Sequence, residues 1–172
     1  MNKSNIVLIG MPGVGKSTVG VILAKILGYQ FLDADLVIQQ QTGKLLKDII
    51  AEVGPEGFIQ VENAVNAGIE TEHTIIATGG SVIYGKEAME HLASIGTVVY
   101  LKVGFDVLTR RLSDIKGRGV VLKDGQDLAG LYEERTPLYE QYADICICED
   151  GLSVEETVDA LVEELCQREV SL

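Results

Sequence analysis

The feature that most constrains this chain is a glycine-rich segment near its N-terminus, Gly10-Met11-Pro12-Gly13-Val14-Gly15-Lys16-Ser17-Thr18. It follows an apolar, β-branched run, Ile6 to Ile9, and precedes a helix-compatible segment, Val19 to Leu27. A strand, a glycine-rich loop and a helix in this order form a phosphate-binding P-loop, whose backbone N–H groups and helix dipole attract an anion. The sequence therefore predicts a nucleoside triphosphate site, with Lys16 on the β- and γ-phosphates and Ser17 on Mg²⁺.

The composition argues against several classes of partner. Lys and Arg number 14 against 26 Asp and Glu, and the net charge of −12 disfavours nucleic acid or an anionic membrane as the main partner. No apolar run approaches the length of a membrane span, and the N-terminus lacks the pattern of a signal peptide. Three cysteines without metal-ligand spacing suit a reducing compartment. We therefore expect a cytoplasmic, monomeric protein whose partners are small molecules.

The chain alternates between strand and helix patterns along its whole length. After the first unit, short apolar runs predict strands at Tyr29–Asp33, Thr74–Ala77, Val98–Leu101 and Ile145–Cys148. Helical patterns fall at Leu36–Gln41, Lys44–Val53, Glu56–Ala67, Lys86–Ser94, Phe105–Leu112, Leu128–Tyr142 and Val154–Cys166. Cys146 and Cys148 share a face of the last strand, and we expect them to fill the core. Five strands separated by helices predict an α/β fold of three layers, a doubly wound parallel sheet with helices on both faces.

Polar segments follow three of these strands and are expected to meet. They are the P-loop, Asp33-Ala34-Asp35 and Thr78-Gly79-Gly80-Ser81, and ligands of such sheets lie beyond the carboxyl ends of the strands. Phosphoryl transfer needs cations around the phosphate and a group that orients the nucleophile. Asp33 could support Mg²⁺, and Asp35 could accept a proton from an acceptor hydroxyl. The alternative is an acidic turn that caps the next helix.

Arginines beyond the fourth strand could supply further cations. The polar, glycine-punctuated segment from Ser113 to Gln126 is predicted to be a mobile loop, in which Arg118 could close over the phosphates. Arg110-Arg111 lies just before the loop, and for Arg110 a solvated helix end is the favoured reading. Arg135 on the following helix could hold an anionic acceptor. From the residues alone, function and a solvated position remain equally open for Arg118 and Arg135.

These motifs together resemble the shikimate kinase family over residues 5 to 150. The residues that carry the resemblance are the P-loop, Phe31-Leu32-Asp33-Ala34-Asp35, Phe58 with Glu62, Ala77-Thr78-Gly79-Gly80, Arg110-Arg111, Arg118, and Glu134-Arg135-Thr136-Pro137-Leu138-Tyr139. The resemblance implies a nucleoside-monophosphate-kinase-like fold with sheet order 2-3-1-4-5. It also implies one P-loop kinase domain over residues 1–172, with a mobile lid at about 113–127 and acceptor-binding helices at about 35–67.

The resemblance further implies a role for each candidate residue. ATP is held by Lys16 and the rest of the P-loop, with Arg111 against the adenine, and the metal Mg²⁺ is held by Ser17 with Asp33 behind it. Asp35 is implied as the base and Arg118 as the lid arginine, both catalytic together with Lys16. The implied ATP site contains Gly13, Val14, Gly15, Lys16, Ser17, Thr18, Arg111 and Arg118. The implied acceptor site contains Asp35, Phe58, Ile59, Gly79, Gly80, Ser81 and Arg135.

The chain departs from the family pattern on the acceptor side. The family has Phe-Arg-x-x-Glu where this chain has Phe58-Ile59-Gln60-Val61-Glu62, so an arginine that helps to bind the acceptor's carboxylate is replaced by Ile59. A third glycine is replaced by Ser81, which adds a hydroxyl donor, and the lid reads Arg118-Gly119-Val120-Val121 where the family has Arg-Pro and leucines. Loss of a charge-assisted, bidentate partner should weaken carboxylate binding by about 2–4 kcal/mol.

Three functions therefore remain open at this point. The first is ATP-dependent phosphorylation of shikimate to shikimate 3-phosphate, a step of aromatic amino acid biosynthesis. The second is the same transfer to a different small polyol or hydroxy acid. The third is an ATP-binding regulatory module without turnover, which the retention of Lys16, Ser17, Asp33, Asp35 and Arg118 disfavours.

Overall fold

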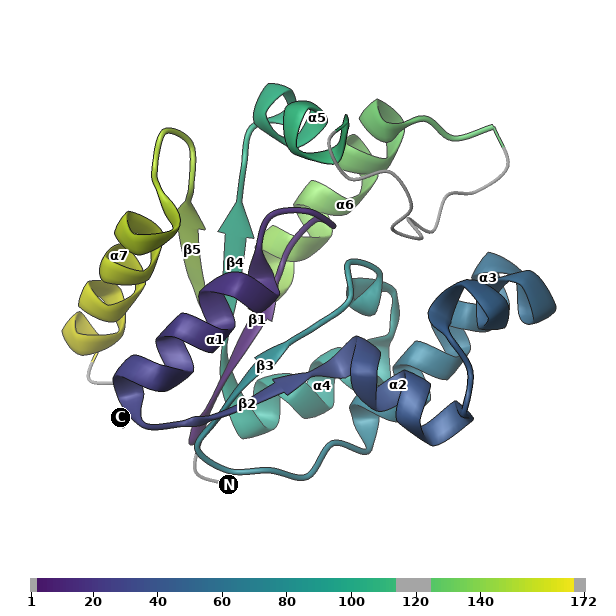
Figure 1. Cartoon of the computed structure of the whole chain (residues 1–172), viewed down its shortest axis with the longest axis horizontal. Coiled ribbons are helices and arrows are strands. Elements are labelled where there is room, and N and C mark those ends of the chain that lie inside the picture. Colours follow the sequence, from purple (N-terminus) through teal and green to yellow (C-terminus); the bar gives the residue numbers. More distant parts are fainter. Residues whose placement is uncertain (1–2, 114–124, 169–172) are drawn as a thin grey trace.

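The computed structural model describes residues 3–113 and 125–168 of the chain. Its centre is a parallel sheet of five strands in the order β2-β3-β1-β4-β5 (Figure 1). The strands are β1 (Asn5–Ile9), β2 (Gln30–Asp33), β3 (Thr74–Ala77), β4 (Gly96–Lys102) and β5 (Ile145–Cys148). This order confirms the predicted doubly wound sheet, because β1 lies between β3 and β4 and the connections leave it in opposite directions.

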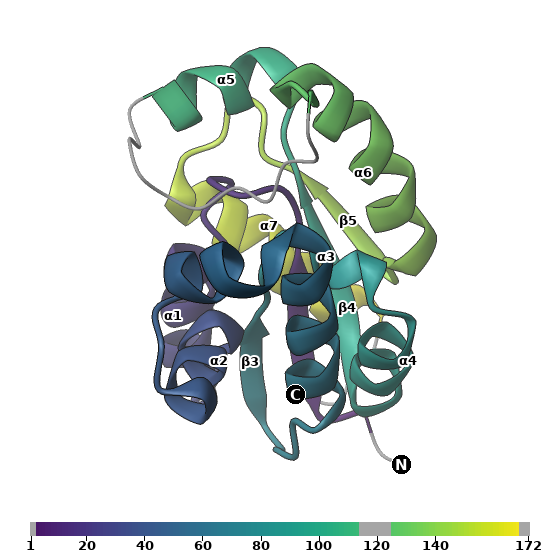
Figure 2. The same ribbon diagram turned by 90° about the vertical axis from the view of Figure 1, so that its right-hand side faces the viewer.

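Helices cover both faces of this sheet (Figure 2). Helix α1 (Lys16–Leu27) packs beside α7 (Val154–Gln167) on one face. The other face carries α4 (Lys86–Ile95), which packs on α3 (Leu46–Ala67), and α6 (Leu128–Tyr142). The remaining helical segments are α2 (Ala34–Thr42), the short 3₁₀ helix η1 (Val82–Tyr84) and α5 (Phe105–Ser113). None of the helices in the described ranges combines the length and the apolar character that crossing a membrane requires.

The central strand β1 is buried along all five residues. It pairs in register with β3 from Ile6 opposite Ile75 and with β4 from Asn5 opposite Gly96. Side chains of both its faces therefore enter the main core, together with Leu23 of α1 and Leu161 of α7. This explains why the run Ile6–Ile9 is continuously apolar rather than alternating.

One prediction about the core is wrong. Cys146 and Cys148 do share a face of β5, but both are exposed, whereas Ile145 and Ile147 are buried. The reason is that β5 is the edge strand of the sheet and alternates between the core and solvent.

Helix α3 is bent where the sequence predicted two helices. Gly54 has φ 72° and ψ 175°, outside the helical region, and Pro55 follows it inside the helix. A left-handed φ is accessible to glycine at low cost, and proline cannot donate the hydrogen bond that would continue the helix. The two halves of α3, residues 46–53 and 56–67, therefore run in different directions (Figure 2).

The amino ends of the central strands are tied together by one buried side chain. Asn5 Nδ2 donates to the carbonyls of Thr71 (2.8 Å) and Ile95 (3.0 Å), and Asn5 Oδ1 accepts from Thr74 N–H at 3.0 Å. Asn5 is 1% exposed, so water cannot replace these bonds. This amide links the segments that enter β3 and β4 to β1.

We expect Asn5→Ala to lower the free energy of unfolding by about 2–4 kcal/mol, because it removes the hydrogen bonds that a buried amide makes to three backbone groups. Chemical denaturation of the purified variant measures this. The matched control is Gln30→Ala at the exposed start of β2, with an expected change within about 0.5 kcal/mol. Equal stability losses in the two variants would show that the Asn5 amide does not hold the strands together.

Candidate active site

A cavity of about 530 Å³ opens at the carboxyl ends of β1, β2 and β3. The P-loop forms one side, the start of α2 and both halves of α3 form another, and the segment after β3 closes it together with Arg135 of α6. The cavity is lined by Pro12, Gly13, Gly15, Lys16, Ser17, Thr18, Asp33, Asp35, Gln39, Leu45, Leu46, Lys47, Phe58, Glu62, Thr78, Gly79, Gly80, Ser81 and Arg135. The three strand-end segments therefore meet, as the sequence predicted.

The P-loop presents a buried cation at the start of α1. Gly13 and Gly15 have positive φ values of 82° and 95°, which turn the backbone into the helix. The Lys16 ammonium donates to the carbonyls of Gly10 (2.8 Å) and Met11 (2.9 Å) and is held inside the loop. Burial lowers the pKa of Lys16 to about 8, although the nearby carboxylate of Asp35 opposes this shift. Lys16 is thus a protonated cation at neutral pH.

Asp33 joins the P-loop to α2 through both of its carboxylate oxygens. Ser17 Oγ donates to Asp33 Oδ2 at 2.9 Å, while Asp33 Oδ1 accepts from the backbone N–H of Asp35 at 3.0 Å. The second bond is an N-cap, so the capping role weighed from the sequence is present. The first bond places a hydroxyl and a carboxylate together at the P-loop, as the predicted metal site requires. The N-cap therefore uses Asp33 Oδ1, while Oδ2 bonds to the P-loop serine.

A buried carboxyl group lies on the other side of the cavity. Glu62 is 1% exposed, and its Oε2 accepts a hydrogen bond from the buried hydroxyl of Ser81. Its Oε1 has no hydrogen-bond partner among the described residues. Burial raises the pKa of Glu62 to about 7; the bond from Ser81 opposes the rise, and the Asp35 carboxylate adds to it. Both carboxyl groups approach Gly79 so closely that a Cβ at this position would collide with Glu62 Oε1 and lie 2.9 Å from Asp35 Oδ1.

A buried arginine completes this side of the cavity. Arg135 is 1% exposed, its guanidinium carbon lies 5.3 Å from the centre of the Tyr84 ring, and its Nε donates to Tyr84 Oη at 3.4 Å. The hydroxyl of Tyr139, one turn along α6, donates to the carbonyl of Gly80 at 2.6 Å. Gly80 passes close to Arg135, because a Cβ there would lie 3.0 Å from Arg135 Nη1. The guanidinium is therefore fixed beside the Gly79–Gly80 backbone.

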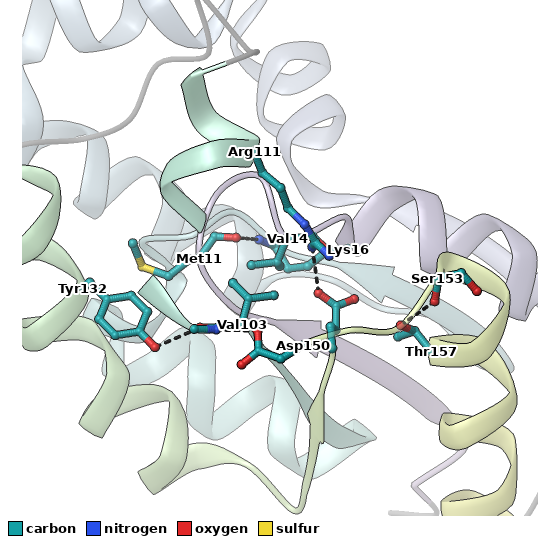
Figure 3. A network of polar contacts seen from close by, with 11 residues as sticks. Met11, Val14, Lys16, Val103, Arg111, Tyr132, Asp150, Ser153 and Thr157 are labelled. Atoms are coloured by element: carbon teal, nitrogen blue, oxygen red, sulfur yellow. Dashed lines mark hydrogen bonds and ion pairs between the residues drawn. The ribbon is translucent and has the colours of Figure 1, made fainter. Parts of the chain in front are cut away.

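Arg111 lies beside the P-loop rather than in the cavity lining. Its Nη1 donates to the carbonyl of Val14 and to Glu149 Oε2, both at 3.1 Å (Figure 3). Glu149 is 3% exposed and follows β5, and burial raises the pKa of its carboxyl group while Arg111 opposes the rise. The hydrogen bond to Val14 joins α5 to the P-loop, and the ion pair joins α5 to the segment after β5. Neither contact was predicted from the sequence.

The structure brings most of the predicted residues into the cavity lining, with four exceptions, and Arg111 beside the P-loop is the first. Val14 is buried, 1% exposed, behind the loop. Ile59 is half-buried and absent from the residues that line the cavity. Its place in the acceptor site stays a prediction. Arg118 lies outside the described residues, and so does most of the predicted lid at about 113–127, because residues 114–124 are not described.

Two residues that matter here gave only faint signals in the sequence. Ser81 pairs with Glu62. Ser81 departs from the family pattern and Glu62 conforms to it, and nothing local connects them because 18 residues lie between them in the chain. Lys47 lines the cavity but belongs to a helical turn rich in charge, and nothing in that pattern distinguishes it from a solvated lysine.

Comparison with known proteins gives consistent matches. The shikimate kinase family model matches residues 12–166. A shikimate kinase of Nostoc sp. is 41% identical over 166 residues, which cover 95% of this chain and 89% of that protein. Among solved structures, shikimate kinase of Acinetobacter baumannii in complex with shikimate has a TM-score of 0.86 at 29% identity, covering 98% of this chain and 96% of that one. Shikimate kinase of Aquifex aeolicus has a TM-score of 0.82 at 31% identity, covering 98% and 99%.

The raised pKa of Glu62 predicts a pH-dependent stability. In the unfolded chain this carboxyl group loses its proton near pH 4.5, whereas in the folded state it does so near pH 7. The folded state therefore holds the extra proton between these values, and the free energy of unfolding falls as the pH rises through this window. Glu62→Gln removes the titration, so its stability relative to the parent should rise by about 1–3 kcal/mol between pH 4.5 and 8.

Denaturation at a series of pH values measures this difference. Glu70→Gln is the control for removing a carboxylate at an exposed position. A Glu62→Gln difference that is the same at pH 4.5 and pH 8 would contradict the assignment.

Proposed function

The chain belongs to the shikimate kinase family, and we propose that it transfers the γ-phosphoryl group of ATP to a hydroxyl group of shikimate, giving shikimate 3-phosphate. The observation that carries this proposal is the division of one cavity into two chemically different sides. The P-loop side offers a cation and hydroxyl groups to phosphates. The other side offers carboxyl groups and a buried guanidinium, which suit an acceptor that has both hydroxyls and a carboxylate.

On the nucleotide side, the P-loop backbone and Lys16 would hold the β- and γ-phosphates. Reaching them requires the ammonium to exchange its bonds to the Gly10 and Met11 carbonyls for phosphate oxygens. Ser17 and Asp33 fit Mg²⁺, since both present hard oxygen donors and this ion is usually held by one or two carboxylates together with phosphates and water. The ion, when bound, neutralises charge on the phosphates.

On the acceptor side, Asp35 is proposed as the general base. Its half-buried carboxylate lies beside Gly79 on the wall that faces the P-loop. As the acceptor oxygen bonds to the γ-phosphorus, the bond to the bridging oxygen of ADP breaks and the acceptor's proton passes to Asp35. Arg135 would bind the carboxylate of the acceptor, while Phe58 and Gly79–Ser81 shape the pocket around its ring.

We also propose that the whole chain, residues 1–172, acts as one monomeric domain in the cytoplasm. In this arrangement the segment at about 113–127 serves as the lid that brings Arg118 onto the phosphates, and residues 35–67 bind the acceptor. Arg111, held by Glu149, would support the P-loop from behind and meet the adenine. The net charge of −12 supports small-molecule partners rather than nucleic acid.

The function is tested directly with the purified protein, ATP, Mg²⁺ and shikimate, with ADP release and the phosphorylated product both measured. The expected result is formation of shikimate 3-phosphate with one ADP released per product. Transfer to another hydroxy acid or polyol of a test panel, without transfer to shikimate, would instead establish a changed acceptor. ATP binding without transfer to any acceptor would establish a regulatory module.

We expect Asp35→Asn to lower kcat by about 10²- to 10⁴-fold while ATP affinity stays within a few-fold, because the amide cannot accept the proton. Steady-state kinetics and calorimetry with an ATP analogue measure the two quantities. Asp159→Asn, on the exposed face of α7, is the control for removing an aspartate charge. An unchanged kcat in Asp35→Asn would exclude this residue as the base.

A further inference from the structure

Two cationic side chains line the cavity outside the phosphate-binding loop. Among the described residues that line the cavity, the cationic side chains are Lys16, Lys47 and Arg135. Lys16 is held in the P-loop by the carbonyls of Gly10 and Met11, on the phosphate side. Lys47 and Arg135 therefore remain for an anionic acceptor.

These two cations differ in how firmly they are held. Arg135 is buried and lies against Tyr84, so its guanidinium has a fixed position. Lys47 is exposed, and no ion pair or hydrogen bond joins its ammonium to another described residue. Lys44, three residues earlier, pairs with Glu52. Lys47 is thus a cation at the cavity that forms no ion pair with a carboxylate of the described residues.

The bend in α3 explains how Lys47 reaches the cavity. Leu46 and Lys47 lie in the first turn of α3, whereas Phe58 and Glu62 lie in its second half, and all four line the same cavity. A straight helix could not do this, because residues 47 and 62 would be separated by about 22 Å along its axis. The non-helical Gly54 turns the first half of α3 over the cavity.

The cation on α3 has therefore changed its position relative to the family pattern. That pattern has an arginine at position 59, and this chain has an isoleucine that does not line the cavity. The neighbouring Glu62 has taken the Ser81 hydroxyl as its partner. Resting on the proposed function, we propose that Lys47 binds the carboxylate of shikimate together with Arg135 and so determines the preference of this enzyme for an acidic acceptor.

The chemistry of lysine sets the expected size of the effect. An ammonium is a compact point charge on a flexible stem and makes no bidentate pair with a carboxylate. Because the carboxylate is remote from the reacting hydroxyl, Lys47 contributes equally to binding the ground state and the transition state. Its removal should raise KM and leave kcat unchanged.

The test compares Lys47→Gln, Lys47→Arg and the parent with shikimate and with the primary amide of shikimate, which keeps the hydroxyls but lacks the charge. We expect Lys47→Gln to raise KM for shikimate at least about tenfold, with kcat and KM for ATP within twofold. Lys47→Arg should keep most of the affinity. With the amide, Lys47→Gln and the parent should differ by less than twofold.

Lys44→Gln is the matched control, since it removes the same charge from an exposed position that does not line the cavity. An unchanged KM for shikimate in Lys47→Gln would overturn the inference while leaving the proposed function standing. Equal losses for shikimate and its amide, or equal losses in Lys44→Gln and Lys47→Gln, would also overturn it. Failure of the parent to phosphorylate shikimate would overturn the proposed function itself.

Discussion

The rest of the structure depends on the parallel pairing of β1 with a neighbour on each side. Parallel strands need crossover connections, and the connections from β1 and from β3 run to opposite faces of the sheet. The two connections therefore diverge at the carboxyl end of β1, and this leaves room for the P-loop and for the cavity beyond it. At the amino end, Asn5 closes the same three strands with hydrogen bonds to backbone groups. One end of the central strand is thus locked and the other is open to ligands.

Buried charge gives the open end its chemistry. Lys16, Glu62 and Arg135 are each at least nine-tenths buried around one cavity, and burial shifts the pKa values of Lys16 and Glu62 in the directions that weaken their charges. Removing charges from water is costly, and a protein retains such groups where they are held by hydrogen bonds or neighbours. Fixed charges in a poorly hydrated site act strongly on a phosphoryl group, because they need little rearrangement during the reaction. The burial that weakens these charges also makes the site suitable for phosphoryl transfer.

The two sides of the cavity come from different parts of the chain, and this allows them to change independently. The phosphate side is built by β1, its loop and α1, whereas the acceptor side is built by α3, the segment after β3 and Arg135. Relative to the family pattern, Ile59 stands in place of an arginine and Ser81 in place of a glycine, whereas the P-loop keeps its pattern. The Ser81–Glu62 hydrogen bond shows that the replacement at position 81 acts on a buried carboxyl group. A buried glutamate without an arginine partner needs another donor, and the hydroxyl of Ser81, 19 residues later in the chain, supplies it.

Local patterns in the sequence determined the elements and the phosphate side of the site. The strand, loop and helix around Lys16, the five apolar runs and the Leu128–Tyr142 helix each depend on neighbouring residues, and the structure has all of them. The strand-end rule also brought Asp33, Asp35 and Gly79 together correctly, because parallel strands end at a common edge. Exposure of Cys146 could not be read from its own strand, since it depends on β5 being at the edge.

The acceptor side was decided by tertiary structure. The pairing of Ser81 with Glu62, the position of Arg111 against Glu149 and the approach of Lys47 to the cavity all join segments that are distant in the chain. The physical reason is geometric. Backbone preferences repeat over a few residues and can be recognised locally, whereas the direction of a side chain toward a distant partner follows from the bend at Gly54 and the packing of whole helices.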